Sequence, residues 1–195
     1  MSKPQARAWP RVLGPWMGDY WRQSHWVFRA LFVGLAFAVL FFRLLPLEQD
    51  LAAFPGPDLM ICLIMAWIVR RPDYLSMPLI LLVVLAEDLV LMRPPGLWTA
   101  IVIIATEQLR ARSALTREVS FPVEWMLVTG VMLAMMLTYR LALAVAFVPQ
   151  PPFGIVLVQL LWSIAFYPLI VGLSRLAFNL RKPATGEVDD YGRRL

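Results

Sequence analysis

The chain has 195 residues, 60% of them hydrophobic and 16% charged, with a formal net charge of +5. Because a soluble domain is typically about 45–50% apolar and about 25% charged, this composition excludes a soluble globular enzyme and a disordered chain. It predicts an all-α integral membrane protein, and a span of roughly 20 apolar residues leaves room for about six transmembrane helices.

The first predicted span follows a segment, residues 1–26, that is rich in Trp, Pro and Arg. Trp and Arg favour the headgroup layer of a membrane, so we expect this cytoplasmic segment to lie at the interface or to form a flexible tail. The span itself is predicted at residues 27–45. Within it, Ala30, Gly34 and Ala38 recur every four residues, a spacing that lets a second helix approach closely.

The next three spans are predicted at residues 58–69, 75–92 and 97–109. The second and fourth spans are shorter than the roughly 20 residues of a full crossing. We therefore expect them to be partly re-entrant or to lie where the bilayer is thinned. The third span contains two adjacent carboxylates, Glu87 and Asp88.

The fifth span is predicted at residues 121–148 and the sixth at residues 153–180, followed by a charged cytoplasmic tail, residues 181–195. Small residues recur every four positions along the fifth span: Gly130, Ala134, Thr138, Ala142 and Ala146. This row predicts a second surface for close helix packing. The expected organisation is a six-helix transmembrane domain over residues 27–180 between two polar terminal segments.

Most of the 18 Lys and Arg residues lie in the terminal segments and in the loops after the second and fourth spans. Cytoplasmic loops carry an excess of Lys and Arg, so this distribution predicts that both termini are cytoplasmic. Only Arg43 and Arg93 are expected on the opposite side. Because the positive charge is divided among several segments, it indicates orientation in a lipid bilayer and not a nucleic-acid surface.

Three charged residues within the predicted spans need a specific explanation: Glu87, Asp88 and Arg140. An ionised carboxylate at the centre of a span costs roughly 2.5–3.5 kcal/mol. Arg140 is expected near the outer leaflet, as are the two carboxylates, and we predict that it pairs with one of them. Three roles stay open, namely a buried ion pair that fixes packing, a proton or substrate site, and a polar contact with a partner. Glu124 and Trp125, which start the fifth span, are expected to be structural.

The sequence contains no motif of a nucleophilic, metal-dependent or phosphate-binding enzyme. The one cysteine, Cys62, and the one histidine, His25, are too few for a zinc site, which needs three or four ligands. We therefore expect a protein that is not an enzyme, with no catalytic residue, metal site or cofactor.

Three features follow one another in order: Pro57-Asp58 opens the short second span, Glu87-Asp88 precedes the turn at Gly96, and Tyr167-Pro168 lies in the last span. The stretch that holds the first two reads FPGPDLMICLIMAWIVRRPDYLSMPLILLVVLAEDLVLMRPPGLWTA. In these features the chain resembles the rod shape-determining protein MreD family, and its alphaproteobacterial branch in particular. The resemblance covers all six predicted spans.

The resemblance implies a non-enzymatic scaffold of the bacterial inner membrane. MreD proteins belong to the machinery that elongates rod-shaped bacteria, where they act in peptidoglycan synthesis and cell shape. They bind MreC, a single-span protein, in a complex with MreB, RodA and a class B penicillin-binding protein. Their helical arrangement is similar to that of the S component of energy-coupling-factor transporters.

Two functions stay open at the level of sequence. In the first, the chain is a scaffold, and the span of a partner docks on a small-residue face of the first or fifth span. In the second, it is a transporter-type subunit that binds a small molecule. The second function needs a pocket near the outer leaflet, lined by Glu87, Asp88, Arg140 and aromatic residues.

Overall fold

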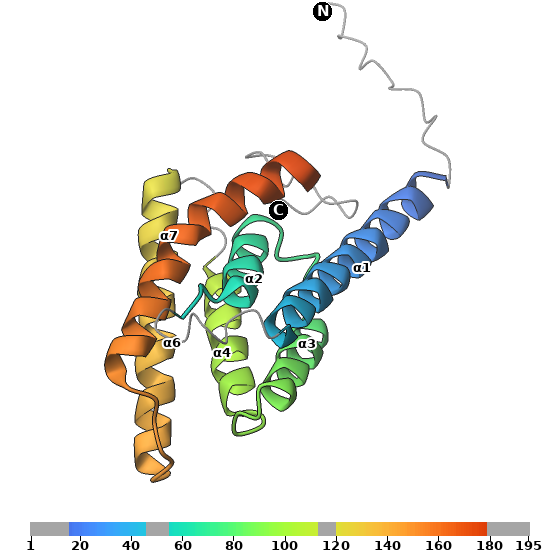
Figure 1. The fold of residues 1–195 in the computed structure, drawn as a ribbon. Coiled ribbons are helices and arrows are strands. Elements are labelled where there is room, and N and C mark those ends of the chain that lie inside the picture. The colour runs from blue at the N-terminus through green and yellow to red at the C-terminus, as the bar shows by residue number, and fades with distance from the viewer. Residues whose placement is uncertain (1–15, 46–54, 113–119, 179–195) are drawn as a thin grey trace, which may run out of the picture.

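The computed structural model describes residues 16–45, 55–112 and 120–178. All regular secondary structure in this part of the chain is helical, with no strand, which confirms the predicted all-α class. The helices are α1 (Trp16–Leu44), α2 (Leu59–Arg70), α3 (Met77–Val90), α4 (Leu97–Ala111), α6 (Phe121–Val145) and α7 (Phe153–Phe178), drawn in Figure 1.

Three of these helices are long and apolar enough to cross a membrane: α1 over Trp26–Leu44, α6 over Phe121–Val145 and α7 over Phe153–Leu176. At about 1.5 Å per residue, the 25 residues of α6 and the 26 of α7 extend beyond the roughly 30 Å of a hydrocarbon core. Their length and apolar composition indicate a membrane protein.

The other helices are short, with 12 residues in α2, 14 in α3 and 15 in α4. At the same rise they extend roughly 18–23 Å, less than the thickness of a hydrocarbon core. The shortness of the second and fourth spans was expected, but α3 is also shorter than the predicted residues 75–92. It begins after the cap residue Ser76, with Pro78 in its first turn, and it ends before Met92, whose φ is 50°.

The first helix begins earlier than the sequence indicated. α1 starts at Trp16, inside the segment predicted as residues 1–26, and continues without interruption to Leu44. The predictions for residues 1–15 and 181–195 fall outside the described residues.

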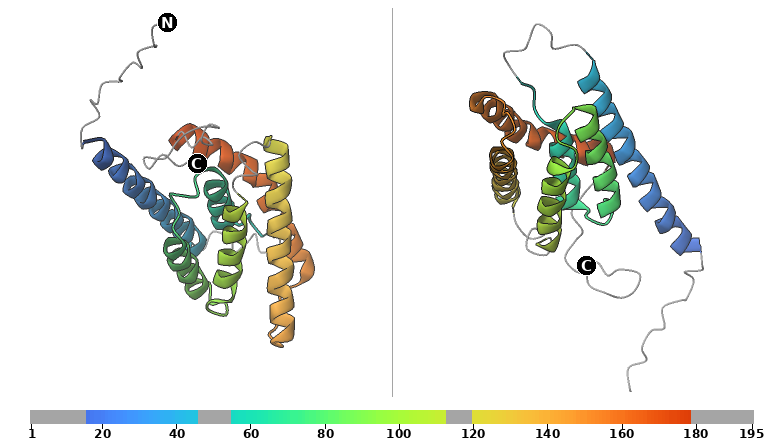
Figure 2. Two further views of the ribbon diagram at one scale, coloured as in Figure 1. Left: turned by 180° about the vertical axis from the view of Figure 1, so that it is seen from behind. Right: turned by 90° about the horizontal axis from the view of Figure 1, so that it is seen from below.

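α2 lies at the centre of the molecule, with the other helices around it (Figure 2). Every residue from Met60 to Arg70 is buried, and the helix packs most closely on α7 and also on α4 and α1. Trp67 of α2 is fully buried and meets Phe32 of α1 with ring centroids 5.5 Å apart. A helix that is apolar all round needs such a surrounding, so α2 forms the core, covered by α1, α4 and α7.

α7 bends, so that its first half lies along α6 and its second half crosses toward α2 (Figures 1 and 2). Pro168 lies inside α7 and has no N–H to donate to the carbonyl of Ile164, four residues earlier. The indole N–H of Trp125 on α6 donates to that carbonyl at 3.0 Å. Trp125 therefore satisfies the backbone group that Pro168 leaves without its usual partner, and it ties α6 to α7.

Contacts between helix termini define two ends of the bundle. Arg43, near the end of α1, meets Asp58 at the start of α2, whereas Arg70 at the end of α2 meets Glu124 at the start of α6. We name these the Asp58 end and the Arg70 end. The Asp58 end also holds the α3–α4 turn and the α6–α7 turn.

Candidate functional site

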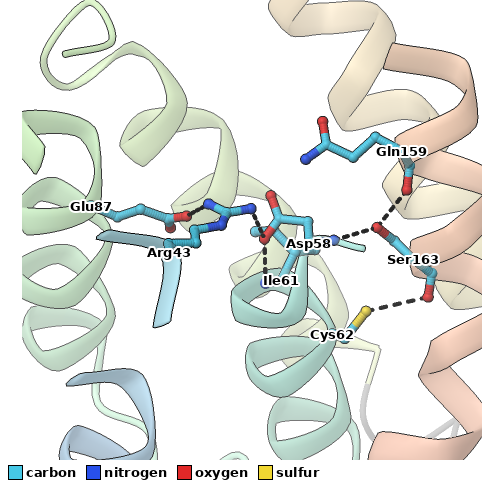
Figure 3. Close-up of polar contacts among 7 residues, drawn as sticks. All are labelled: Arg43, Asp58, Ile61, Cys62, Glu87, Gln159 and Ser163. Carbon is cyan, nitrogen blue, oxygen red and sulfur yellow. Dashed lines mark hydrogen bonds and ion pairs between the residues drawn. The ribbon is translucent and has the colours of Figure 1, made fainter. Parts of the chain in front are cut away.

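The two adjacent carboxylates of α3 have different partners, and neither partner is Arg140. Glu87 is fully buried and pairs with Arg43, whose Nη1 donates to Glu87 Oε1 (Figure 3). The predicted pairing of Arg140 with Glu87 or Asp88 is therefore wrong. The reason is the packing order, because Arg43 ends a helix that packs on α3, whereas Arg140 lies on α6, which packs on α4 and α7.

Arg43 also reaches a second carboxylate, that of Asp58. Its Nη2 lies 3.4 Å from Asp58 Oδ1, so one guanidinium joins α1, α2 and α3 (Figure 3). The same Oδ1 accepts a hydrogen bond from Ile61 N at 3.3 Å and thereby caps α2. A carboxylate at a helix N-terminus is favoured by the exposed N–H groups and the helix dipole. The Pro57-Asp58 motif thus has a local structural reason.

Ser163 connects the start of α2 to α7. Its Oγ accepts a hydrogen bond from Asp58 N at 2.7 Å and donates to the carbonyl of Gln159 at 2.8 Å. The thiol of Cys62 donates to the carbonyl of Ser163 at 3.3 Å (Figure 3). A continuous polar network therefore crosses the Asp58 end from α3 through α1 and α2 to α7.

Asp88 caps the following helix. Its Oδ2 accepts hydrogen bonds from Gly96 N at 3.2 Å, Thr99 N at 3.1 Å and Thr99 Oγ1 at 2.8 Å. Gly96 has a φ of 87°, a left-handed conformation that disfavours any side chain with a Cβ. Asp88 and Gly96, which carry part of the resemblance, therefore act together in one turn: the carboxylate of Asp88 binds the backbone amide of Gly96.

Arg140 fixes the α6–α7 turn. Its Nη1 donates to the carbonyl of Pro151 at 3.1 Å, and its guanidinium lies over the ring of Phe153, 5.2 Å from the centroid. Its own carbonyl accepts a hydrogen bond from Gln150 Nε2 at 3.0 Å. No ion pair of Arg140 occurs in the part of the chain that the structure describes.

A cavity of about 400 Å³ lies at the Asp58 end, between α6, α7 and the starts of α2 and α4. Methionine side chains of α6 form much of its wall, and two arginines, Arg93 and Arg140, also line it. Trp98 and Tyr139 are in the lining and meet edge to face, with centroids 5.3 Å apart. Of the three charged residues expected to line a pocket, Arg140 does so, and Glu87 and Asp88 belong to the networks beside it.

A second buried polar cluster lies at the Arg70 end. Arg70 Nη2 is 2.9 Å from Glu124 Oε1, and both side chains are almost completely buried. The hydroxyl of Tyr167 donates to the same carboxylate oxygen at 3.0 Å, and Arg70 Nη1 donates to the carbonyl of Ala66 at 3.2 Å. Arg70 directly follows the predicted second span, in a loop expected to be cytoplasmic, and Glu124 was expected to be structural at the start of the fifth span. Both residues lie at the end of an apolar segment, on the side of the membrane predicted to be cytoplasmic. This shared position could have predicted that they pair.

The small-residue rows point away from the interior. Three residues of the α6 row and two of the α1 row are exposed, and one of the α1 row is half-buried: Gly130, Ala134, Thr138, Ala30, Gly34 and Ala38. A Cβ built on either glycine would have no neighbouring heavy atom within 4 Å. Among the described helices, these faces are therefore not used for packing within the chain, and docking of a partner there stays a prediction.

Comparisons with protein-family models, with curated protein sequences and with solved structures find no match to the chain.

Proposed function

We propose that the chain is a non-enzymatic membrane scaffold of the MreD kind. In this proposal it binds MreC in the bacterial inner membrane and keeps it within the elongation complex of MreB, RodA and a class B penicillin-binding protein. The protein then helps to control peptidoglycan synthesis and cell shape. All six helices belong to the membrane domain, in an arrangement like that of an S component, and both termini are cytoplasmic.

The outward placement of small residues on two long helices carries this proposal. Gly34 on α1 and Gly130 on α6 are exposed, and each has open space where a side chain would begin. Lipid tails are as apolar as leucine, so helices associate in a bilayer by close van der Waals packing, which small residues permit. A partner with a single span, such as MreC, offers one helix of the kind that these faces accept.

The test introduces bulk at these two positions. We expect Gly34→Leu and Gly130→Leu to reduce the amount of MreC that co-purifies with the chain from membranes, because a leucine holds the partner's backbone away. Since a Cβ at either glycine meets no neighbouring atom, the fold of the chain itself should be retained.

Matched controls place the same leucine on the same helices where a large side chain already stands. Val33→Leu on α1 and Met126→Leu on α6 change exposed apolar residues and should leave co-purification at the wild-type level. If both glycine variants recover as much MreC as the wild type, docking on these faces is excluded. If the controls lose as much MreC as the glycine variants, the effect does not depend on close packing.

The cavity favours a second candidate, a transporter-type subunit that binds a small molecule. Its volume of about 400 Å³ falls in the range of ligand pockets, roughly 300–1,000 Å³. Its lining combines apolar side chains with a few polar groups, as ligand pockets do. The two candidates are compatible, because the small-residue faces are not part of the cavity lining.

A further inference from the structure

The cavity at the Asp58 end has an apolar wall and a cationic rim. Met132, Met135 and Met136 of α6 line it from within the bundle, and all three are buried. Two arginines line the cavity at the Asp58 end, close to the interhelical turns. Arg93 belongs to the α3–α4 turn, and Arg140 lies near the end of α6. This division of apolar and charged groups is the lining that an amphipathic ligand needs.

Aromatic rings hold both guanidinium groups in place. The guanidinium of Arg93 lies 5.7 Å from the ring centroid of Trp98, and that of Arg140 lies 5.2 Å from the centroid of Phe153. Such cation–π contacts position an arginine without neutralising its charge. Trp98 also lines the cavity, so the group that positions Arg93 belongs to the same site as the two arginines.

The two arginines of the rim are not neutralised by a direct ion pair. Across residues 16–45, 55–112 and 120–178, neither Arg93 nor Arg140 forms an ion pair. The one carboxylate in the lining is Asp58, and it is already bound by Arg43 and by the first turn of α2. A guanidinium has five N–H donors, and the contacts of Arg140 use one of them, so donors remain for an anion.

We propose that this cavity binds an anionic phospholipid of the surrounding bilayer. The phosphate lies between Arg93 and Arg140, which donate charge-assisted hydrogen bonds to its oxygens. An acyl chain follows the methionine wall, where flexible thioether side chains adapt to its shape. This inference deepens the second candidate function and rests on it, and it is independent of the binding of MreC.

The first experiment uses the full chain purified in a neutral detergent and compares three probes by native mass spectrometry. We expect phosphatidylglycerol to bind one site at least about tenfold more tightly than zwitterionic phosphatidylcholine with the same chains. Inorganic phosphate at the same concentration should not displace it, because phosphate lacks the apolar part. Phosphatidylglycerol with short acyl chains should bind more weakly than the long-chain lipid.

The second experiment removes the rim charges. The double variant Arg93→Gln/Arg140→Gln should bind phosphatidylglycerol no better than phosphatidylcholine, a loss of about tenfold or more. The matched control is Arg71→Gln/Arg112→Gln, which removes two charges beyond α2 and α4 at the Arg70 end and should bind like the wild type. The comparison of lipids on the unaltered chain tests the proposal even where a variant does not fold.

Several results would overturn the proposal. Equal binding of the two long-chain lipids would show that the rim does not select a negative headgroup. Displacement by inorganic phosphate would assign the site to a free anion. An equal loss in the control variant would assign the bound lipid to general surface charge. None of these results bears on co-purification with MreC, so failure of this proposal and failure of the scaffold proposal are distinguishable.

Discussion

A buried ion pair stands at each end of α2, and the two pairs differ in how completely they are enclosed. Arg70 and Glu124 have exposed fractions of 2% and 1%, whereas Arg43 keeps 20% and its partner Glu87 keeps none. Removing one partner of a buried pair leaves an uncompensated charge in a medium that solvates it poorly. Substitution of one partner should therefore destabilise the protein more at the Arg70 end than at the Asp58 end.

Substitution Glu124→Gln is expected to lower the free energy of unfolding by about 3–5 kcal/mol, because the buried guanidinium of Arg70 loses its counter-charge. Tyr167→Phe removes one hydrogen bond to the same carboxylate and should cost about 1.5–3 kcal/mol. Chemical unfolding of the purified protein in detergent, followed by tryptophan fluorescence, measures both values.

The chain contains a matched control for this substitution. Glu107 pairs with Arg110 three residues later at 2.9 Å, but its side chain is 41% exposed. Glu107→Gln should therefore change the free energy of unfolding by less than about 1 kcal/mol. Equal losses in the Glu107 and Glu124 variants would contradict the assignment of the Arg70 cluster as the more buried pair.

The sequence singled out the correct acidic residues of α3 but not their partners. Glu87 is conspicuous because it interrupts an apolar run, and in the structure its side chain is fully buried. Its partner Arg43 was counted only as an orienting charge outside the membrane, as Arg70 was on the other side. Which arginine meets which carboxylate depends on the packing of helices that are distant in sequence, and hydrophobic periodicity holds no information on that order.

At the scale of elements, α3 and α6 end in the same way. The amide of Arg93 donates to the carbonyl of Asp88 at 3.0 Å, and the amide of Val148 donates to the carbonyl of Leu143 at 3.0 Å. This pattern turns the chain through one left-handed residue, a position that glycine usually fills. Here Met92 and Phe147 fill it, with φ of 50° and 55°. Both helices therefore end at a backbone position that carries strain.

Substitution Met92→Gly is expected to raise the free energy of unfolding by about 1 kcal/mol, because glycine adopts the left-handed conformation without a Cβ clash. The side chain of Met92 is 94% exposed, so its loss removes little packing within the chain. Leu82→Gly, at an exposed position in the interior of α3, serves as the control with the opposite sign and should cost about 1 kcal/mol. Thermal unfolding in detergent measures the stability of both variants. If both variants are destabilised, the claim that Met92 carries backbone strain is contradicted.

Helix lengths show how far apolar composition predicts elements. The long apolar runs of α6 and α7 are recognised without ambiguity, because their length exceeds what a soluble core helix needs. The boundaries of α1 and α3 were misjudged, since each is set by local chemistry. α1 extends back to Trp16 through a segment that mixes charged, polar and aromatic residues, and α3 ends at its cap and its left-handed turn. A pocket lined by Arg140 and aromatic residues was expected for one of the two functions, but its methionine wall and Arg93 were not, because they depend on the packing of α6 against α4 and α7.

At the scale of the whole molecule, arginines lie at both ends of the bundle, with Arg43, Arg93 and Arg140 at the Asp58 end. Arginines gather where α2 and α4 end, at Arg70, Arg71, Arg110 and Arg112. The acidic residues Asp58, Glu87 and Asp88 lie toward the opposite end, each engaged by a partner within the chain. Cytoplasmic loops carry an excess of Lys and Arg, so the distribution of these residues along the sequence predicts that the Arg70 end faces the cytoplasm and the Asp58 end faces outward.

This orientation is testable because the chain has one cysteine, and Cys62 is buried and unpaired. A new cysteine therefore reports on its own position. Pro95, in the α3–α4 turn, and Ser120, before α6, are both exposed and lie at opposite ends. In intact spheroplasts, a membrane-impermeant maleimide should label Pro95→Cys and should label Ser120→Cys only after permeabilisation. The reverse labelling would show the opposite orientation, with the cationic rim of the cavity at the cytoplasmic leaflet. Labelling of both cysteines from outside would show that the short helices do not carry the chain across the bilayer.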